Sequence, residues 1–264
     1  MITLYHNEMS TCSQKVRLCL AEKGLEWTSH HLDLRAGDQQ QEWYVKLNPR
    51  AVVPTLVDGD EVVPESNVIL EYLEERYPEP ALMPRQPIGK ARVRLWTKQL
   101  DEGIHDAGIS VLSFALAFSQ QYLAKGEKGR ATMQGGRVTG KREAREQILE
   151  LGLGAPPVRA AVHPMQDLIA SMQAGLEKSA WLASDGYTLA DAAFTPYLTR
   201  LDHLGLLGLL DDAPLVKDWY DRCRQRPSYQ AAIKQWENKD YLALMQSSGE
   251  HNWPTIRTLM RDEN

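Results

Sequence analysis

Residues 51–66 of this chain read AVVPTLVDGDEVVPES, and this stretch decides the class of fold that the sequence predicts. Two short β-rich runs, Thr55–Val57 and Glu61–Val63, flank a turn centred on Gly59, which is the pattern of a β-hairpin. Val53-Pro54 stands just before the hairpin, where a proline is tolerated only at a sheet edge or with a special bond geometry. The stretch therefore predicts the antiparallel end of a sheet.

Outward from the hairpin, strand and helix patterns alternate. The predicted elements are, in order, a strand over 2–6, a helix through 16–21, a strand over 27–34, a short helix over 39–46, the hairpin, and a helix that opens at Ser66. Strands alternating with helices predict a mixed sheet. The order β-α-β-α-β-β-α is the thioredoxin-like arrangement.

A proline-rich break over 78–87 follows, and everything after it has the periodicity of helices. We therefore predict a thioredoxin-like domain over 1–80, a linker over 81–87 and an all-α domain over 88–264. Within the last, the predicted helices cover 91–123 and about 157–178, 188–204, 213–225 and 227–247. Residues 126–140 are polar, glycine-rich and basic, which predicts a mobile loop in an insertion near 124–160.

Composition narrows the classes of function. The 264 residues are 43% hydrophobic and 25% charged, as in globular proteins, and the net charge of -5 argues against a binder of duplex nucleic acid. No apolar run approaches the roughly 20 residues that cross a bilayer, and the N-terminus lacks the features of a signal peptide. Three cysteines without a zinc-type cluster favour a reducing compartment. We expect a cytoplasmic, metal-free protein with no membrane contact that binds a small molecule.

Residues 10–14, STCSQ, lie between the first strand and the first helix. Thr11 and Gln14 have capping-box spacing, which predicts Thr11 as the N-cap, with Ser10 just outside the helix and Cys12 in its first turn. Unpaired amides at a helix N-terminus favour an anion. A ligand thiolate could be held there by the amides and a serine hydroxyl, or Cys12 itself could be activated. The alternative is that the hydroxyl residues only cap the helix and Cys12 is a packed side chain.

Two further signals flank the hairpin. A cis Val53–Pro54 bond would leave the Val53 amide and carbonyl free to bind an extended peptide as an added strand; the alternative is an ordinary trans proline. Ser66 as an N-cap would present its hydroxyl and the following amides to a carboxylate, while Glu65 could take an ammonium group. A plain capped helix is the alternative there.

These motifs together resemble the glutathione-site motifs of the cytosolic glutathione transferases, in the right order and close to theta- and zeta-class spacing. The residues that carry the resemblance are STCSQKVR over 10–17, Asn48-Pro49, Val53-Pro54 and Glu65-Ser66. The resemblance covers essentially the whole chain, because the family's second domain is also all-helical. Thr188-Leu189-Ala190-Asp191 matches a buried capping box of that second domain.

The resemblance implies roles for individual residues. Ser10 falls on the catalytic serine of theta- and zeta-like members and on the catalytic cysteine of omega-like members, and Cys12 falls on the covalent cysteine of bacterial reductive dehalogenases. For glutathione, the resemblance implies that Val53 and the cis Pro54 bind the cysteinyl backbone and that Glu65 and Ser66 bind the γ-glutamyl end. It implies Gln39 for the glycine carboxylate and adds Thr11 to the binding residues. Some classes carry a basic or polar residue where this chain has Ala51, and the neighbouring Arg50 could compensate for it.

The runs 48–57 and 91–102 look like the bacterial branch that includes the β-aryl etherases. The implied reaction is nucleophilic attack of the glutathione thiolate on a small hydrophobic electrophile, with aryl ether or halide cleavage as examples, by a homodimer. His105, Ile109 and Leu112 are candidates for the substrate pocket, although helical stripes are usually core and His105 could be only an interface residue. A glutathione-dependent isomerase or thiol-disulfide reductase using Cys12, and a non-enzymatic glutathione-binding module, are the alternatives.

Overall fold

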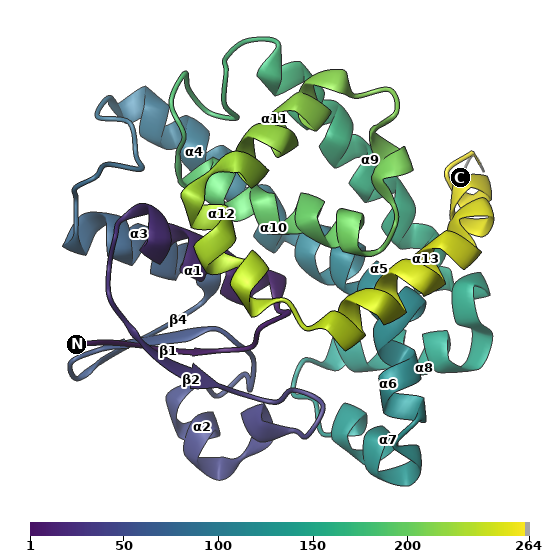
Figure 1. Cartoon of the computed structure of the whole chain (residues 1–264). Coiled ribbons are helices and arrows are strands. Elements are labelled where there is room, and N and C mark those ends of the chain that lie inside the picture. The colour runs from purple at the N-terminus through teal and green to yellow at the C-terminus, as the bar shows by residue number, and fades with distance from the viewer. Residues whose placement is uncertain (262–264) are drawn as a thin grey trace.

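A four-stranded mixed sheet organises the smaller, N-terminal part of the molecule (Figure 1). This part, which ends with α3 (Ser66–Arg76), is called the sheet half, and the larger part after it is called the helical half. The computed structural model describes residues 1–261. The strands, in the spatial order β2-β1-β3-β4, are β2 (Thr28–His31), β1 (Ile2–His6), β3 (Thr55–Asp58) and β4 (Glu61–Pro64). β1 pairs in parallel with β2 and antiparallel with β3, which pairs antiparallel with β4. The predicted hairpin is confirmed.

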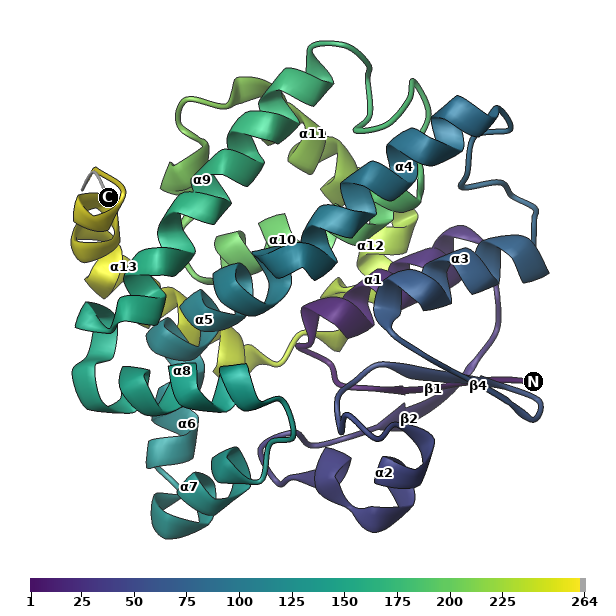
Figure 2. The same cartoon turned by 180° about the vertical axis from the view of Figure 1, so that it is seen from behind.

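Helices cover both faces of this sheet. They are α1 (Thr11–Glu22), α2 (Glu42–Leu47), preceded by a short 3-10 turn over Asp38–Gln40, and α3 (Ser66–Arg76). α1 and α3 lie on one face and α2 on the other (Figures 1 and 2). The predicted order β-α-β-α-β-β-α is confirmed, but β2 is shorter than the predicted 27–34 because the Asp33 carboxylate accepts the amides of Arg35 and Ala36 and turns the chain.

The rest of the chain is helical, as predicted. The α-helices are α4 (Pro87–Gln99), α5 (Ser110–Ser113), α6 (Ser119–Leu123), α7 (Gly126–Gln134), α8 (Thr139–Leu151), α9 (Pro156–Leu176), α10 (Leu189–His203), α11 (Pro214–Gln225), α12 (Pro227–Ala232) and α13 (Lys239–Leu259). Short 3-10 turns cover Gly152–Gly154, Leu207–Leu210 and Lys234–Trp236. Among residues 1–261, no helix is both long and apolar enough to cross a membrane.

The predicted single helix over 91–123 is wrong in detail. It begins earlier, at Pro87, whose fixed φ suits the first turn, and it is interrupted. Wide π-type turns cover Leu100–Ile109 and Phe114–Phe118, and Gly103 breaks the first of them with φ 136°. Such a φ favours glycine over residues with a side chain. The break lies two residues before His105 and redirects the chain at the junction of the two halves.

The predicted mobile loop over 126–140 is also wrong, because most of it is helical. α7 packs on α6 at Gly129, where an added Cβ would lie 2.0 Å from the carbonyl oxygen of Tyr122, and Met133 is buried. The apolar anchors are too few and too widely spaced to give a clear helical period in a polar, glycine-rich stretch.

The last predicted helix, 227–247, is two helices. α12 ends at Ala232, and α13 starts after Asn238, whose side-chain oxygen accepts the amide of Tyr241 at 3.1 Å. Asparagine is a strong N-cap residue, so this side chain fixes the second start.

The predicted capping box at Thr188 is confirmed and buried. The Asp191 carboxylate accepts the amide of Thr188 at 2.8 Å, the amide of Leu182 at 3.0 Å and the indole N–H of Trp219 at 2.8 Å. A buried carboxylate is tolerated when its oxygens are hydrogen-bonded. Asp191 therefore holds α10, α11 and the loop before α10 in one arrangement.

Contacts of α1 fix the helical half against the sheet. The guanidinium of Arg17 donates to the carbonyl of Ala232 at 2.7 Å, and Glu22 accepts two bonds from Arg226 at 2.6 and 2.7 Å. We still propose 81–87 as the linker between the domains. Residues 81–86 lie in the irregular segment between α3 and α4, where the amide of Leu189 donates to the carbonyl of Leu82, and Pro87 is the first residue of α4.

Candidate functional site

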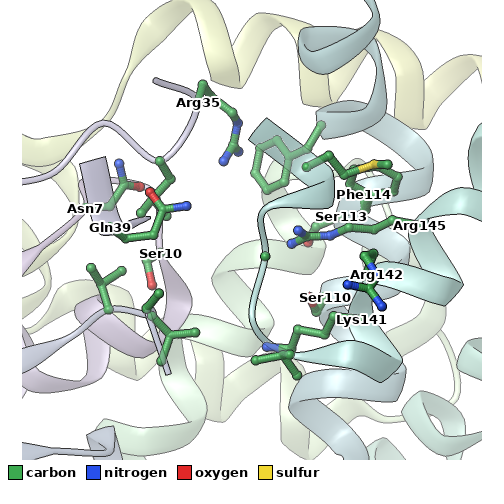
Figure 3. A pocket seen from close by; sticks show the side chains of 18 of the residues that line it. Asn7, Ser10, Arg35, Gln39, Ser110, Ser113, Phe114, Lys141, Arg142 and Arg145 are labelled. Atoms are coloured by element: carbon green, nitrogen blue, oxygen red, sulfur yellow. The ribbon is translucent and has the colours of Figure 1, made fainter. Parts of the chain in front are cut away.

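A cavity lies where the sheet half meets the helical half (Figure 3). The sheet half contributes residues from the loop after β1, from the turn around Gln39 and from the segment before β3. The helical half contributes residues from the kinked helix around His105, from the α7–α8 segment and from α10. The predicted site residues that line it are Ser10, Thr11, Gln39, Arg50, Val53, His105 and Ile109.

Ser10, and not Thr11, is the N-cap of α1, so the predicted cap is wrong by one residue. Ser10 has extended backbone angles and its hydroxyl accepts the amide of Ser13 at 3.3 Å, while its carbonyl accepts the amide of Gln14 at 2.9 Å. Capping-box spacing from Thr11 to Gln14 was misleading because a serine in the preceding position can cap as well. The Ser10 hydroxyl keeps its own proton for a ligand, and it lines the cavity beside the N-terminal amides.

Cys12, in the first turn of α1, contacts His105, and its Sγ lies 3.6 Å from both ring nitrogens. Burial raises the pKa of this thiol, but the charges of His105 and Lys15 and the hydrogen bond with His105 outweigh it and lower the pKa to about 6. Cys12 itself is not among the cavity-lining residues, although His105 is. The geometry therefore supports the predicted activation of Cys12. The residue that contacts it is His105, which the sequence predicted only for the substrate pocket.

Lys15 is a site residue that the sequence reasoning missed. Its side chain is fully buried, and its ammonium donates to Ser66 at 3.3 Å and to the Asn67 amide oxygen at 3.2 Å, 5.2 Å from the Tyr197 ring centroid. Burial lowers the pKa of Lys15. The signal in the sequence is a lysine on the apolar side of a short helix. The Lys15 ammonium places a positive charge between α1 and α3, and this charge acts on Cys12.

The Val53–Pro54 bond is cis, as predicted. Side chains of α2 and of the residue after it hold the segment: the Tyr44 hydroxyl donates to the carbonyl of Val52 at 2.7 Å, and the Asn48 amide donates to the same oxygen at 3.0 Å. Val53 lines the cavity, whereas Pro54 does not.

Glu65, and not Ser66, precedes the first helical residue of α3, so that predicted cap is also wrong by one. Glu65 has φ 67°, a conformation that costs a residue with a side chain about 1–3 kcal/mol. Its carboxylate pairs with Arg50, and the Ser66 hydroxyl is occupied by Lys15. Two predicted ligand groups, Arg50 and Glu65, therefore form an ion pair with each other at the edge of the cavity.

Gln39 lies at the cavity with its side-chain oxygen buried and without a hydrogen-bond partner among residues 1–261. A buried unpaired acceptor is costly, which favours a ligand donor at this place. Leu112 is wrong as a pocket residue: it does not line the cavity, is 1% exposed and packs in the hydrophobic core. Ile109, on the same helix, does line the cavity.

The segment predicted as an insertion forms a wall of the cavity. Gln40 donates to the carbonyl of Thr132 in α7 at 2.8 Å, and Lys125 donates to the carbonyl of Arg35 at 3.0 Å. Arg35, Lys141, Arg142, Arg145 and Arg200 line the cavity and were not predicted, because they come from distant segments. In the described part of the chain, no group of three or more His, Cys, Asp or Glu residues is placed to hold a metal ion.

Comparison with known families agrees with this geometry. Residues 9–76 match the family model of the glutathione S-transferase N-terminal domain, and residues 161–227 match that of the C-terminal domain. The chain belongs to the glutathione S-transferase family. The first match includes the end of α1 that carries Ser10, and the second includes α10 with its buried Asp191.

Several relatives of the chain have names that report different activities. A stringent starvation protein A homolog of Coxiella burnetii is 28% identical over 239 residues, with 90% of this chain and 94% of the relative covered. A tetrachloro-p-hydroquinone reductive dehalogenase of Sphingobium chlorophenolicum is 27% identical, with 88% and 95% covered. The crystal structure of the β-etherase LigF from Sphingobium sp. has a TM-score of 0.78 at 27% identity and covers 89% of this chain and 98% of its own.

We predict that Cys12 is alkylated with a pH midpoint near 6, since the thiolate is the reactive form. Replacing His105 with Gln removes a positive charge and should raise the midpoint toward the ordinary value of a thiol. The rate of iodoacetamide labelling at each pH, with the modified peptide identified by mass spectrometry, measures this. Cys19 is buried, which raises its pKa to about 12 and keeps it slow to react. The exposed His251, replaced with Gln, is the control, and an unchanged midpoint in the His105 variant would contradict the assignment.

Proposed function

We propose that this protein is a glutathione transferase in which the glutathione thiolate attacks a small electrophile held by the helical half. The observation that carries the proposal is the cavity itself, which places the capped N-terminus of α1 opposite a wall of helical-domain side chains (Figure 3). In the reaction, the thiolate sulfur forms a bond to carbon, and the leaving group departs with its electron pair. The β-etherase LigF and the reductive dehalogenase among the relatives support a reaction at an aryl ether or aryl halide.

Ser10 is the residue we propose for stabilising the sulfur. Its hydroxyl is already oriented by the cap, lines the cavity and can donate to a thiolate, and the first amides of α1 point the same way. An oriented donor needs no reorganisation when the thiolate forms. No separate general base is required, because stabilising the thiolate lowers the pKa of the bound thiol so that the proton leaves to solvent.

Glutathione would lie along the sheet side of the cavity. Val53 would pair with the cysteinyl backbone as an added strand. The Gln39 side-chain N–H would donate to the glycine carboxylate, and its unpaired oxygen would accept a ligand N–H. Glu65 would bind the ammonium of the γ-glutamyl group, in competition with its present partner Arg50, and Ser66 its carboxylate. Release of Arg50 from Glu65 would free a cation for a carboxylate of the ligand.

If Ser10 stabilises the sulfur, Ser10→Ala should lower the turnover of glutathione with chlorodinitrobenzene by about 100-fold and raise the pKa of bound glutathione. Cys12→Ala should cost much less. Steady-state rates and the ultraviolet absorbance of the bound thiolate against pH measure both effects. Cys19→Ala, a buried thiol of the same helix, is the control. Full activity in the Ser10 variant would show that the backbone amides or another residue do this work.

A second candidate function uses Cys12 as a nucleophile toward a disulfide, as a glutathione-dependent reductase. The observation that favours it is the contact of Cys12 with His105 and the lowered pKa of its thiol. The Cys12 thiolate would attack one sulfur of the disulfide and release the other as a thiolate; glutathione would then resolve the mixed disulfide. In that case the order of the two variants reverses, and Cys12→Ala abolishes turnover while Ser10→Ala does not.

Glu65→Gln and Ser66→Ala should each weaken the binding of glutathione by about 1.5–3 kcal/mol, because each removes a hydrogen bond to a charged group of the ligand. Titration calorimetry with glutathione measures the dissociation constant directly and does not depend on turnover. Glu61→Gln, at an exposed position of β4 in the same half, is the matched control. Unchanged binding in both site variants would remove the proposed γ-glutamyl site.

We also propose a homodimer, supported by exposed apolar side chains on α3 and α4. Val68, Ile88 and Leu95 are 57%, 64% and 64% exposed, and α3 and α4 lie side by side, joined by the ion pair of Glu71 and Arg94. Light scattering should give a mass of about twice 29.9 kDa. Leu95→Asp should shift the mass to that of one chain, while Leu151→Asp, on the exposed side of α8, should not; a monomer before any substitution would contradict the proposal.

A further inference from the structure

The cavity is strongly cationic, although the chain as a whole carries a net charge of -5. Among its described lining residues there is no aspartate and no glutamate. Besides Arg50, which pairs with Glu65, the cations that line it are Arg35, Arg137, Lys141, Arg142, Arg145 and Arg200. One of these, Lys141, has a carboxylate partner nearby, Asp106 at 2.6 Å. A site of one charge sign inside an acidic protein concentrates ligands of the opposite sign.

Three of the cations come together from separate parts of the fold. Arg35 follows β2, Arg145 belongs to α8 and Arg200 to α10, and none of the three forms an ion pair with a carboxylate within residues 1–261. The guanidinium carbons of Arg35 and Arg200 lie 4.2 and 5.1 Å from the centroid of the same ring, that of Phe118. Arg145 lies 5.2 Å from the centroid of Phe114. The three are called the arginine cluster below.

Arg200 shows most directly that the arginine cluster is incomplete. It is 3% exposed; its two terminal nitrogens donate to the Ser113 hydroxyl and to the carbonyl of Met9, but its Nε is buried without a partner in the described chain. Burial and, to a smaller extent, the charge of Arg35 lower the pKa of Arg200 to about 9. Burial and the charge of Arg35 also lower the pKa of Arg145. A buried cation without a carboxylate partner is unfavourable, and Arg35 and Arg145 add like charge beside Arg200, so a bound anion would stabilise this arrangement.

The surroundings of the arginine cluster indicate what else the ligand carries. The rings of Phe114, Phe118 and Tyr122 line the same cavity. An adjoining pocket is walled by apolar side chains of the helical half and shares Phe114 and Arg145 with the cavity; among its walls are Val111, Ile148, Pro157 and Ala160. Aromatic faces next to guanidinium groups suit a planar, apolar body that ends in an oxyanion. Figure 3 shows Arg145 and Phe114 on the wall that faces Ser10.

We propose that the electrophile of this enzyme is an anionic aromatic compound whose carboxylate is bound by the arginine cluster, with its ring against Phe114 and Phe118. This inference rests on the proposed function, because it names the substrate class of the same site. A carboxylate is a group that a guanidinium binds with two parallel hydrogen bonds, and it would supply the counter-charge that the cluster lacks. The same chemistry could come from the glycine carboxylate of glutathione, so the test separates the two sources.

The test uses two aryl chlorides with the same reacting centre: a benzoate with chloride para to the carboxylate and nitro groups on both sides of the chloride, and its methyl ester. In both, the glutathione sulfur bonds to the ring carbon, chloride leaves with the bonding electrons, and the thiol proton goes to solvent. Dividing kcat/KM by the uncatalysed rate constant removes the difference in intrinsic reactivity. Dinitrobenzoate and its methyl ester, which lack the leaving group, report binding alone by calorimetry.

We expect the carboxylate to be preferred over the ester by about tenfold or more after this correction, since the lost contacts are hydrogen bonds to a charged group. Arg145→Gln and Arg35→Gln should each remove about tenfold of kcat/KM for the carboxylate, leave the ester within about twofold, and leave the dissociation constant of glutathione unchanged. Arg130→Gln, an exposed arginine of α7 outside the cavity, is the control.

The outcomes separate the inference from the proposed function. Equal losses on carboxylate and ester with weaker glutathione binding would mean that the cluster holds glutathione, and would overturn the inference. Turnover of the ester with no binding of dinitrobenzoate would also overturn it, while the proposed function stands. Binding of dinitrobenzoate that depends on Arg145, without turnover of either chloride, would support the anion site and sink the proposed transferase.

Discussion

The placement of α1 between the sheet and the helical half is the constraint on which the site depends. Arg17 is almost fully buried, and its guanidinium donates hydrogen bonds to four acceptors, among them the carbonyls of Asn7 and Ala232 and the ring of His6. Burial and the charge of Arg17 lower the pKa of His6 to about 3, so His6 is neutral and accepts the bond. A buried cation is tolerated only when its donors are satisfied, and these bonds therefore fix α1 on two elements at once. The positions of Ser10 and Cys12 follow from that.

The N-terminal end of α1 carries both groups that are candidates for the reaction at sulfur, the Ser10 hydroxyl and the Cys12 thiol. Ser10 faces the cavity as the cap, while Cys12 turns to His105 on the kinked helix. Lys15, one turn further, adds a positive charge that also lowers the pKa of Cys12. The kink at Gly103 matters here, because it brings His105 to the N-terminal end of α1. The two functions proposed for this chain therefore differ in which of these two groups, the Ser10 hydroxyl or the Cys12 thiol, meets the ligand.

The sequence predicted what depends on local patterns. Hairpin residues around Gly59, the Thr188 capping box and the order of strands and helices all express short-range preferences, and the structure confirms them. The two caps at Ser10 and Glu65 were each missed by one residue. At α1 the neighbouring Ser10 and Thr11 are both able to cap, and at α3 no side chain caps the helix, because Glu65 pairs with Arg50 and Ser66 accepts from Lys15. The arginine cluster could not be predicted, because residues 35, 145 and 200 come from three segments that are far apart in the sequence. No local pattern around these residues indicates that they line the same cavity.

The α7–α8 segment is joined to the rest of the helical half at both of its ends and reaches the sheet half through a few side chains, such as Gln40 and Arg35. It forms a wall of the cavity without contributing to the sheet or to the buried network of Asp191. Evolution can therefore lengthen, shorten or recharge this segment while the sheet and the end of the cavity at α1 stay intact. A change in the ligand that the cavity accepts can therefore begin in this pair of helices, although Arg35 and Arg200 on its other walls lie outside them.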